Sequence, residues 1–205
     1  MDPRAPIPTR GAVQIRPARP ADAAALERFF DRCSPESRYQ RFHGATGPTV
    51  RRELARITAG SPDHRSWVAV DARDGRTIRG TATLARGHDG EVEVAFLVED
   101  GWTRHGVGRR LFGEMALHAE AEGLESLVAR VQGGNERARR FLRTVAPGAR
   151  TRFLGAGEFE LDLPVAPAAQ LARLAPVDAL DVGASSHRRR AGFAGRRPVD
   201  GQVSA

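Results

Sequence analysis

The sequence predicts a fold of the α+β class: a mixed, mostly antiparallel central sheet of about six to seven strands, flanked by about four helices. Three runs show the pattern of strands, at 66–72, 77–85 and 91–99. They are separated by Asp74-Gly75 and Asp89-Gly90, and an Asp-Gly pair between apolar runs is a strong hairpin signal. The remaining chain carries further helical and strand patterns on both sides of this meander.

Ahead of the meander we expect one strand and three helices. Gln14 to Arg16 lies in an alternating stretch that is typical of a short strand. Pro20 then suits the first turn of a helix, because its fixed φ matches that position and its missing N–H is not needed there. Two further helices are expected, over 34–42, where Ser34 is a cap candidate, and over about 49–58.

After the meander comes a turn that contains glycine, followed by the clearest helix of the chain. Apolar residues recur there at helical spacing, namely Val107, Leu111, Phe112, Met115 and Ala119. Gly123 is a natural end for this helix. A strand over 124–132, a helix capped by Asn135 and a closing strand pair over 150–154 and 158–163 complete the prediction.

Composition divides the chain into a lead segment over 1–11, a folded domain over 12–164 and a Pro-, Ala- and Arg-rich tail over 165–205. We expect the tail to be disordered, with a short amphipathic helix over 168–180 as an alternative for its first part. The tail holds six arginines and three aspartates, so it supplies three of the seven net positive charges. The domain itself is only mildly basic, which argues against a nucleic-acid partner. Binding of nucleic acid through the arginines of the tail stays an alternative.

The overall composition indicates in which cellular compartment the protein is expected. No apolar run approaches the roughly 20 residues that a membrane span needs, and the N-terminus lacks the apolar core of a secretory signal. Cys33 is the only cysteine and cannot form an internal disulfide. We therefore expect a protein of the reducing cytoplasm that has no membrane partner.

The turn from Trp102 to Leu111 has the pattern of an anion site. The N–H groups at a helix start have no partner inside the helix, and the helix dipole adds partial positive charge there. Gly106 and Gly108 allow close approach of a ligand. Formal positive charge comes from three arginines, at 104, 109 and 110. A diphosphate suits such a site.

Two nucleotide-binding motifs fit this turn poorly. A Rossmann fingerprint needs a third glycine where Leu111 stands, and an acidic residue at the end of the next strand, which ends in Arg130 and Gln132. A Walker loop needs a lysine, and all 32 basic residues of the chain are arginines.

The chain resembles the GNAT superfamily of acyl-CoA N-acyltransferases in the run EVEVAFLVEDGWTRHGVGRRLFGEMALHAEAEG, and in the strand and the helix NERARRFL that follow. Gly106 and Gly108 match the two small positions of the family signature Gln/Arg-x-x-Gly-x-Gly/Ala. Thr103 departs from its first position. The resemblance covers roughly residues 12–164 and implies the GNAT fold, with the pyrophosphate of coenzyme A held by main-chain groups of the turn.

An upstream stretch, IRPARPADAAALERFFDRCSPESRYQRFHG, is similar to the start of the GNAT domain in bacterial protein-lysine acetyltransferases. This likeness implies acetyl-CoA as the acyl donor and a primary amine as the acceptor, either a protein lysine or a small molecule, with no metal. The oligomeric state, monomer or homodimer, stays open.

The resemblance also implies which residues contact the cofactor. Backbone N–H groups near Leu97 and Val98 are expected to face the thioester carbonyl, where the strand splays from its neighbour. Asn135 matches the family's asparagine at the pantetheine arm, although a plain N-cap role is equally well supported. The turn is expected to contribute Arg104, His105, Gly106, Val107, Gly108 and Arg109. Many members carry a tyrosine that protonates the leaving thiolate where this chain has Leu142, so water or another side chain would take that role.

The amine must lose a proton before it attacks, so a carboxylate on the strand 91–99 is the expected general base. Glu91, Glu93 and Glu99 point to the same face of this strand by its two-residue alternation. Glu93, in the context Val-Glu-Val-Ala-Phe, best matches the glutamate of the lysine acetyltransferase group and is the predicted base. The alternative is that these glutamates form a solvated strand face.

Other reactive residues give weaker candidates. A lone cysteine such as Cys33 is more often a small buried residue than a nucleophile, and the six histidines show no metal-ligand spacing. The predicted function is an acetyl-CoA-dependent N-acetyltransferase. The alternative is a module of the same fold that binds acyl-CoA with little or no turnover.

Overall fold

The computed structural model describes residues 12–42, 47–87 and 89–174, and the parts of the expected lead segment and tail at 1–11 and 175–205 lie outside these ranges. The strands are β1 (Val13–Pro17), β2 (His64–Asp71), β3 (Ile78–Arg86), β4 (Val92–Val98), β5 (Ser126–Gln132), β6 (Arg150–Gly155) and β7 (Glu158–Pro164). The helices are α1 (Ala23–Arg32), α2 (Pro35–Phe42), α3 (Pro48–Ala59), α4 (Val107–Ala121), α5 (Glu136–Val145) and α6 (Val165–Leu174), with short 3-10 turns η1 (Pro20–Asp22) and η2 (Asp100–Trp102).

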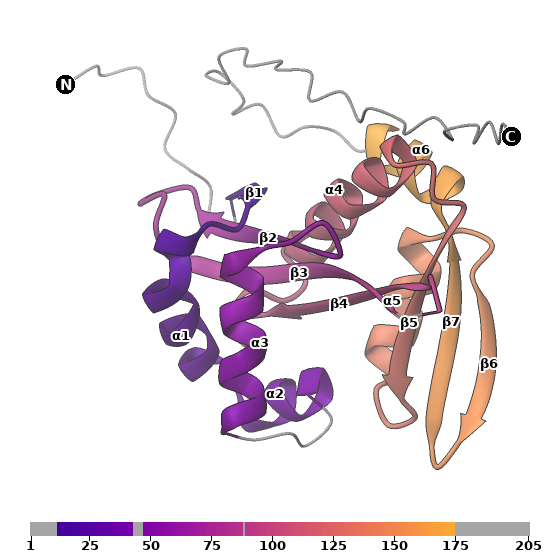
Figure 1. Ribbon diagram of the computed structural model, residues 1–205, viewed down its shortest axis with the longest axis horizontal. Coiled ribbons are helices and arrows are strands. Elements are labelled where there is room, and N and C mark those ends of the chain that lie inside the picture. The colour runs from indigo at the N-terminus through magenta and orange to yellow at the C-terminus, as the bar shows by residue number, and fades with distance from the viewer. Residues whose placement is uncertain (1–11, 43–46, 88, 175–205) are drawn as a thin grey trace, which may run out of the picture. The chain divides into compact units, whose positions relative to one another are not determined.

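The strands form one mixed sheet in the order β1-β2-β3-β4-β5-β7-β6 (Figure 1). The predicted meander is confirmed, because β2, β3 and β4 pair antiparallel, with Trp67 opposite Ala82 and Ala82 opposite Phe96. β5, β7 and β6 are also antiparallel neighbours. β4 and β5 are parallel, and they join the two antiparallel parts of the sheet.

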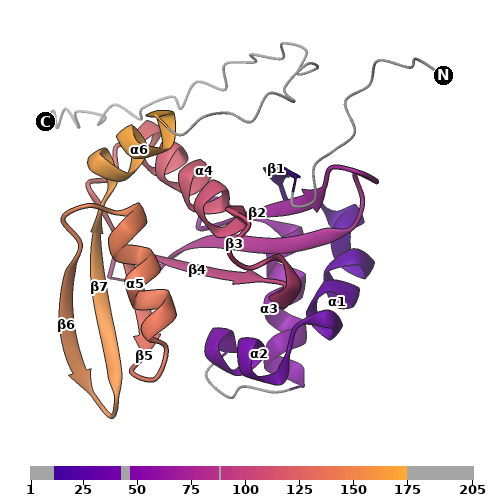
Figure 2. The ribbon, with the colours of Figure 1, turned by 180° about the vertical axis from the view of Figure 1, so that it is seen from behind.

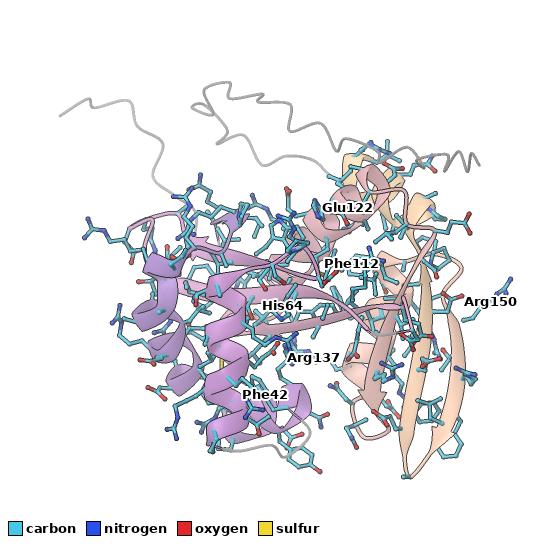
Figure 3. The ribbon with its side chains drawn as sticks, viewed as in Figure 1. Phe42, His64, Phe112, Glu122, Arg137 and Arg150 are labelled. Atoms are coloured by element: carbon cyan, nitrogen blue, oxygen red, sulfur yellow. The ribbon has the colours of Figure 1, made fainter. Side chains whose placement is uncertain are left out.

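Helices cover both faces of the sheet, and each face has its own apolar core. On one face α1 and α3 bring Leu26, Phe29 and Ile57 onto the β2–β4 strands. On the opposite face lie α4 and α5 (Figure 2). There Phe112 of α4 packs between its helix and the sheet and is 1% exposed (Figure 3). Side chains that alternate along these strands are therefore buried on both faces of the sheet, each face against its own core, and neither face is left to solvent as a whole.

The described residues contain six α-helices, whereas the sequence predicts about four overall and places five along the chain. The last of them, α6, begins directly after the expected end of the domain at residue 164. Its Val165, Ala168 and Ala169 are buried in the core beneath α4. Small residues permit this packing, since a Cβ placed on Gly113 of α4 would lie 3.1 Å from the Cβ of Ala172. The folded part thus continues ten residues past that boundary.

Arg173 at the end of α6 forms an ion pair with Glu120 of α4. One of the six tail arginines is therefore engaged within the folded part, and the other five lie outside the described residues. Among the helices of the described ranges, none has both the length and the apolar content that crossing a membrane requires.

A partly buried ion pair ties two of the helices to the sheet on the α1–α3 face. Glu53 of α3 accepts a hydrogen bond from Arg41 of α2 at 3.0 Å, and its carboxylate lies 3.5 Å from Nε2 of His64, the first residue of β2. His64 is 3% exposed. The contact with His64, together with the charge of Arg41, outweighs burial and holds the pKa of Glu53 at about 2.

We predict that Glu53→Gln lowers the free energy of unfolding at pH 7 by about 1–3 kcal/mol, because it leaves Arg41 and His64 without their carboxylate. The pKa of Glu53 lies below its unfolded value of 4.5, so its contribution is present above about pH 4.5 and is lost as the pH falls toward about 2. Urea unfolding between pH 2 and pH 8 checks this. The exposed Glu27→Gln is the matched control, and equal losses in both variants would contradict the assignment.

Candidate functional site: the fork between β4 and β5

The sheet opens between its two parallel strands. β4 pairs with β3 over its whole length and β5 pairs with β7 over its whole length. Between β4 and β5, however, the only registered pair among the described residues is Glu93 with Val128. Beyond that pair the strands diverge, as Figure 1 shows, and the C-terminal half of β4 borders a gap instead of a neighbouring strand.

The antiparallel register decides which backbone groups face this gap. Glu99 donates its N–H to Arg79 of β3, and Gly87 donates to Glu91, so the odd-numbered residues of β4 are the ones hydrogen-bonded to β3. The amides of Phe96 and Val98 therefore point toward β5, where pairing has ended. The N–H of Leu97 is directed at β3. Of Leu97 and Val98, the two residues whose amides were expected to face the thioester, only Val98 directs its N–H into the fork between β4 and β5.

The turn after β4 places a helix start beside the fork. Gly106 precedes α4 with φ +78°, a conformation that suits glycine, and its carbonyl accepts the first helical bond from Arg110. No side chain caps this helix. The N–H groups of Val107, Gly108 and Arg109 consequently have no acceptor inside the helix, which is the arrangement that favours an anion.

The rest of the turn is folded back on itself. The Thr103 hydroxyl donates to the Asp100 carbonyl at 2.7 Å, and Nδ1 of His105 lies 2.9 Å from the Thr103 carbonyl. Arg104 has φ +66°, which is uncommon for a residue with a side chain. Trp102 packs beneath the turn, with the guanidinium carbon of Arg79 4.8 Å from the centre of its ring. The threonine at the family's Gln/Arg position thus closes the turn.

Gly108 is a point of close approach between α4 and α5. A Cβ at this position would lie 3.3 Å from Cζ of Phe141, so any side chain here would press on that ring. Phe141 also packs edge-on against Phe96 of β4, with ring centres 5.5 Å apart. These two rings form the apolar side of the fork, and Gly108 lets α5 close over the start of α4.

A cavity of about 850 Å³ runs from the turn through the fork. Four elements line it: α2, the end of β4, the turn with the start of α4, and the segment from Gly133 into α5. Its charged residues are mostly basic, with two glutamates at 36 and 136 and five arginines at 41, 104, 109, 137 and 140. The charge and size of the cavity suit a long anionic ligand.

Most of the predicted cofactor residues lie on this cavity, namely Leu97, Val98, Arg104, Gly106, Gly108, Arg109 and Asn135. Two do not line it. Val107 is 1% exposed and belongs to the core, so only its backbone N–H is directed at the turn. His105 is exposed and turned toward Thr103.

Asn135 has the N-cap geometry that the sequence left as one of two alternatives. Its Oδ1 accepts the N–H of Ala138 at 3.0 Å, and the residue also borders the cavity. The side-chain carbonyl is thus engaged in capping, while the NH₂ group of the same amide is a donor at the cavity wall. Leu142 is 1% exposed in the core beneath α5.

Glu93 lies where β4 and β5 part, but it is not among the residues that line the cavity. Its Oε2 accepts a hydrogen bond from Arg130 of β5 at 2.8 Å, and the Arg130 guanidinium also contacts Glu91 and Glu160. Burial acts to lower the pKa of Arg130, but the carboxylate charges of Glu93 and Glu160 and the hydrogen bonds to Glu91 and Glu93 raise it overall. Glu99, the third glutamate of this face, pairs with Arg32 and Arg79 instead.

The segment 31–45, where the sequence places the acceptor, contributes α2 to the cavity wall, but the sequence did not predict how α2 is held there. The Ser34 and Ser37 hydroxyls both donate to Oδ1 of Asp100, at 2.9 and 2.7 Å, and the Ser34 N–H donates to Oδ2 at 2.8 Å. Burial works to raise the pKa of Asp100, and these hydrogen bonds outweigh it, so the pKa is lowered. Asp100 thereby fixes the start of α2 to the segment that precedes the turn from Trp102 to Leu111. The two serines of the Ser-Pro-Glu-Ser motif were the only sequence feature from which this contact with Asp100 could have been inferred.

Cys33 does not lie in a setting that favours a nucleophile, and three of the six histidines, at 43, 88 and 187, lie outside the described residues. Burial raises the pKa of Cys33 to about 12, so the nucleophilic thiolate is disfavoured there. Within the described part of the chain, no group of three or more histidine, cysteine, aspartate or glutamate side chains is placed to hold a metal ion.

Similarity to known proteins agrees with this geometry. A family model described as an acetyltransferase (GNAT) domain matches residues 13–145. The acetyltransferase Pat of Mycolicibacterium smegmatis is 27% identical over 151 residues, which are 73% of this chain and 45% of that protein. A mycothiol acetyltransferase of Thermobifida fusca is 46% identical over 57 residues, which are 27% of this chain and 17% of that protein. The chain therefore spans less than half the length of these curated relatives.

Solved structures show the same fold. The GNAT domain of S. lividans PAT superimposes with a TM-score of 0.65 at 25% identity, covering 74% of this chain and 90% of that domain. The PaiA N-acetyltransferase of Thermoplasma acidophilum, solved in complex with coenzyme A, has a TM-score of 0.55 at 16% identity and covers 75% of this chain and 99% of its own. With the family model matching well over half of its length, the chain belongs to the GNAT acetyltransferase family.

Proposed function

We propose that this chain is an acetyl-CoA-dependent N-acetyltransferase that acts on a primary amine. The observation that carries the proposal is the cavity on which the outward amides of β4 and the uncapped start of α4 converge. The amides of the helix start can hold a pyrophosphate, and the arginines around them add charge. The PaiA enzyme, solved with coenzyme A, shares the fold and lends support to this ligand.

Each part of the site has a role in this reaction. Acetyl-CoA, when bound, supplies an acetyl group activated as a thioester. The Val98 amide donates to the thioester oxygen and stabilises the negative charge that develops there. Gly106 and Gly108 let the main chain approach the pyrophosphate, and Asn135 donates its NH₂ group to the pantetheine arm. The amine nitrogen bonds to the carbonyl carbon as the carbon–sulfur bond breaks.

Glu93 is the proposed general base. It takes the proton that the ammonium group of the acceptor must lose, either directly or through a water molecule, since the carboxylate stands outside the cavity wall. Arg130 fixes the orientation of this carboxylate through the 2.8 Å hydrogen bond. The departing thiolate takes a proton from water, because Leu142 stands at the family's tyrosine position and the only tyrosine, Tyr39, lines a different cavity.

We predict that Glu93→Gln lowers kcat/KM for the amine by about 100-fold or more, while the affinity for acetyl-CoA stays unchanged. The variant keeps the shape of the side chain but cannot accept the proton. Thiol release during turnover and calorimetric titration with acetyl-CoA measure the two quantities. Glu91→Gln is the matched control, because Glu91 shares the partner Arg130. Full turnover by the Glu93 variant would refute the base assignment.

Gly108→Val is expected to weaken acetyl-CoA binding by about tenfold or more, because the new side chain presses on Phe141 and narrows the cavity at the helix start. Gly101→Ala is the control, since a Cβ there meets nothing within 4 Å. Titration calorimetry, with circular dichroism to verify folding, compares the two. If a folded Gly108 variant bound acetyl-CoA with wild-type affinity, the assignment of the pyrophosphate to this turn would be wrong.

A second candidate is a module of the same fold that binds acyl-CoA without turnover. It is favoured by the position of Glu93, which is paired with Arg130 and lies outside the cavity wall. Acceptor-dependent thiol release separates the two candidates. A catalyst releases thiol when an amine is added and loses this activity in the Glu93→Gln variant. A sensor binds acetyl-CoA equally well in both forms and releases no thiol above background.

A further inference from the structure

A row of charged side chains crosses three strands beside the fork. The register sets Arg130 of β5 directly opposite Glu160 of β7, and Glu160 directly opposite Arg152 of β6. Residues directly opposite one another in antiparallel strands point to the same face of the sheet, where opposite charges attract. Arg130 donates to Glu160 at 3.3 Å, and Arg152 donates to it from the other side. The Glu160 carboxylate therefore lies between two guanidinium groups.

Arg130 also reaches from β5 to β4 across the start of the fork. It lies two residues past Val128, which forms the registered pair with Glu93. Its guanidinium donates to Glu93 at 2.8 Å and to Glu91 at 2.9 Å. The side chain of Arg130 thus connects the two strands at the point where their backbones part. Whatever orients this guanidinium also decides where the carboxylate of Glu93 is held.

The three carboxylates around Arg130 differ in their exposure to water. The side chains of Glu91 and Glu93 are each 42% exposed, whereas that of Glu160 is 11% exposed. Water can replace an exposed carboxylate as the acceptor of an arginine N–H, so the loss of such a carboxylate costs little. The loss of a buried acceptor leaves the donor facing it without a partner. We therefore expect the orientation of Arg130 to depend on Glu160 more than on Glu91.

We propose that Glu160 is a positioning residue for the general base, because it holds Arg130 in the orientation in which that guanidinium fixes the carboxylate of Glu93. This inference rests on the proposed function and deepens it. Glu160 contacts Arg130 and Arg152, and it acts on Glu93 through Arg130. Without the charge of Glu160, Arg130 turns away from β7, and Glu93 is no longer held where β4 and β5 part.

Steady-state kinetics of the full chain test this role. Glu160→Gln keeps the shape of the side chain and removes its charge. We expect it to lower kcat by about tenfold, because the base is misplaced, and to leave KM for acetyl-CoA unchanged, because Glu160 is not among the residues that line the cofactor cavity. Asp162→Asn is the matched control. It makes the same change of charge on the same face of β7, but opposite Val128, and should change kcat less than about twofold.

A double-mutant cycle distinguishes positioning from a general loss of stability. If Glu160 acts through Arg130, its replacement has little further effect once Arg130 is also replaced. The Arg130→Gln, Glu160→Gln double variant should therefore have nearly the same kcat as the Arg130→Gln variant. Circular dichroism verifies that each variant is folded. Losses of kcat that multiply in the double variant, or wild-type kcat in a folded Glu160→Gln variant, would overturn the inference.

Nuclear magnetic resonance of the arginine side chains tests the inference without turnover. A guanidinium that is held by carboxylates rotates slowly, so its Nη–H groups give separate signals at low temperature, whereas a free one gives a merged signal. We expect separate signals for Arg130 in the wild type and merged signals in Glu160→Gln, with Arg130→Lys used to assign them. A merged signal in the wild type, or separate signals that persist in the variant, would contradict the inference. Failure of the proposed function shows separately, as absence of thiol release with every amine.

Discussion

The structure depends on one interruption of the sheet, the loss of pairing between β4 and β5 beyond Glu93 and Val128. Backbone amides that would otherwise join two strands are left facing a gap, and Phe96 and Val98 direct theirs toward it. Unpaired buried amides destabilise a fold unless a ligand or water satisfies them. The fork is therefore the place where we propose that a ligand satisfies these amides, and the two antiparallel parts of the sheet hold it open.

The turn and α2 complete the fork from opposite sides. Gly106 ends the turn so that the first amides of α4 stay free, and Gly108 lets Phe141 close over them. Asp100, two residues ahead of Trp102, binds both serines of the α2 start. A single short segment thus positions both the uncapped start of α4 and the α2 wall of the cavity.

Structural features that depend on residues close together in the chain, such as turns, could be predicted from the sequence. The Asp-Gly turns indicated the β2–β4 meander, and Gly106 with Gly108 indicated the turn that leads into α4. Features that depend on distant contacts were not predictable in this way. The Ser34–Asp100 bonds join residues 66 positions apart, and Arg130 reaches Glu93 across 37 positions. A short helix over 168–180 was one alternative from the sequence, but the packing of α6 against Gly113 of α4 was not predictable in this way.

The most direct test of this account is a backbone amide titration with acetyl-CoA, followed by nuclear magnetic resonance. We predict that the amides of Val98, Gly106, Val107, Gly108 and Arg109 shift together at one dissociation constant, and that the amide of Leu97, which is bonded to β3, shifts much less. Binding of acetyl-CoA without a response from the Val98 amide or from the start of α4 would contradict the assignment of the fork as the cofactor site.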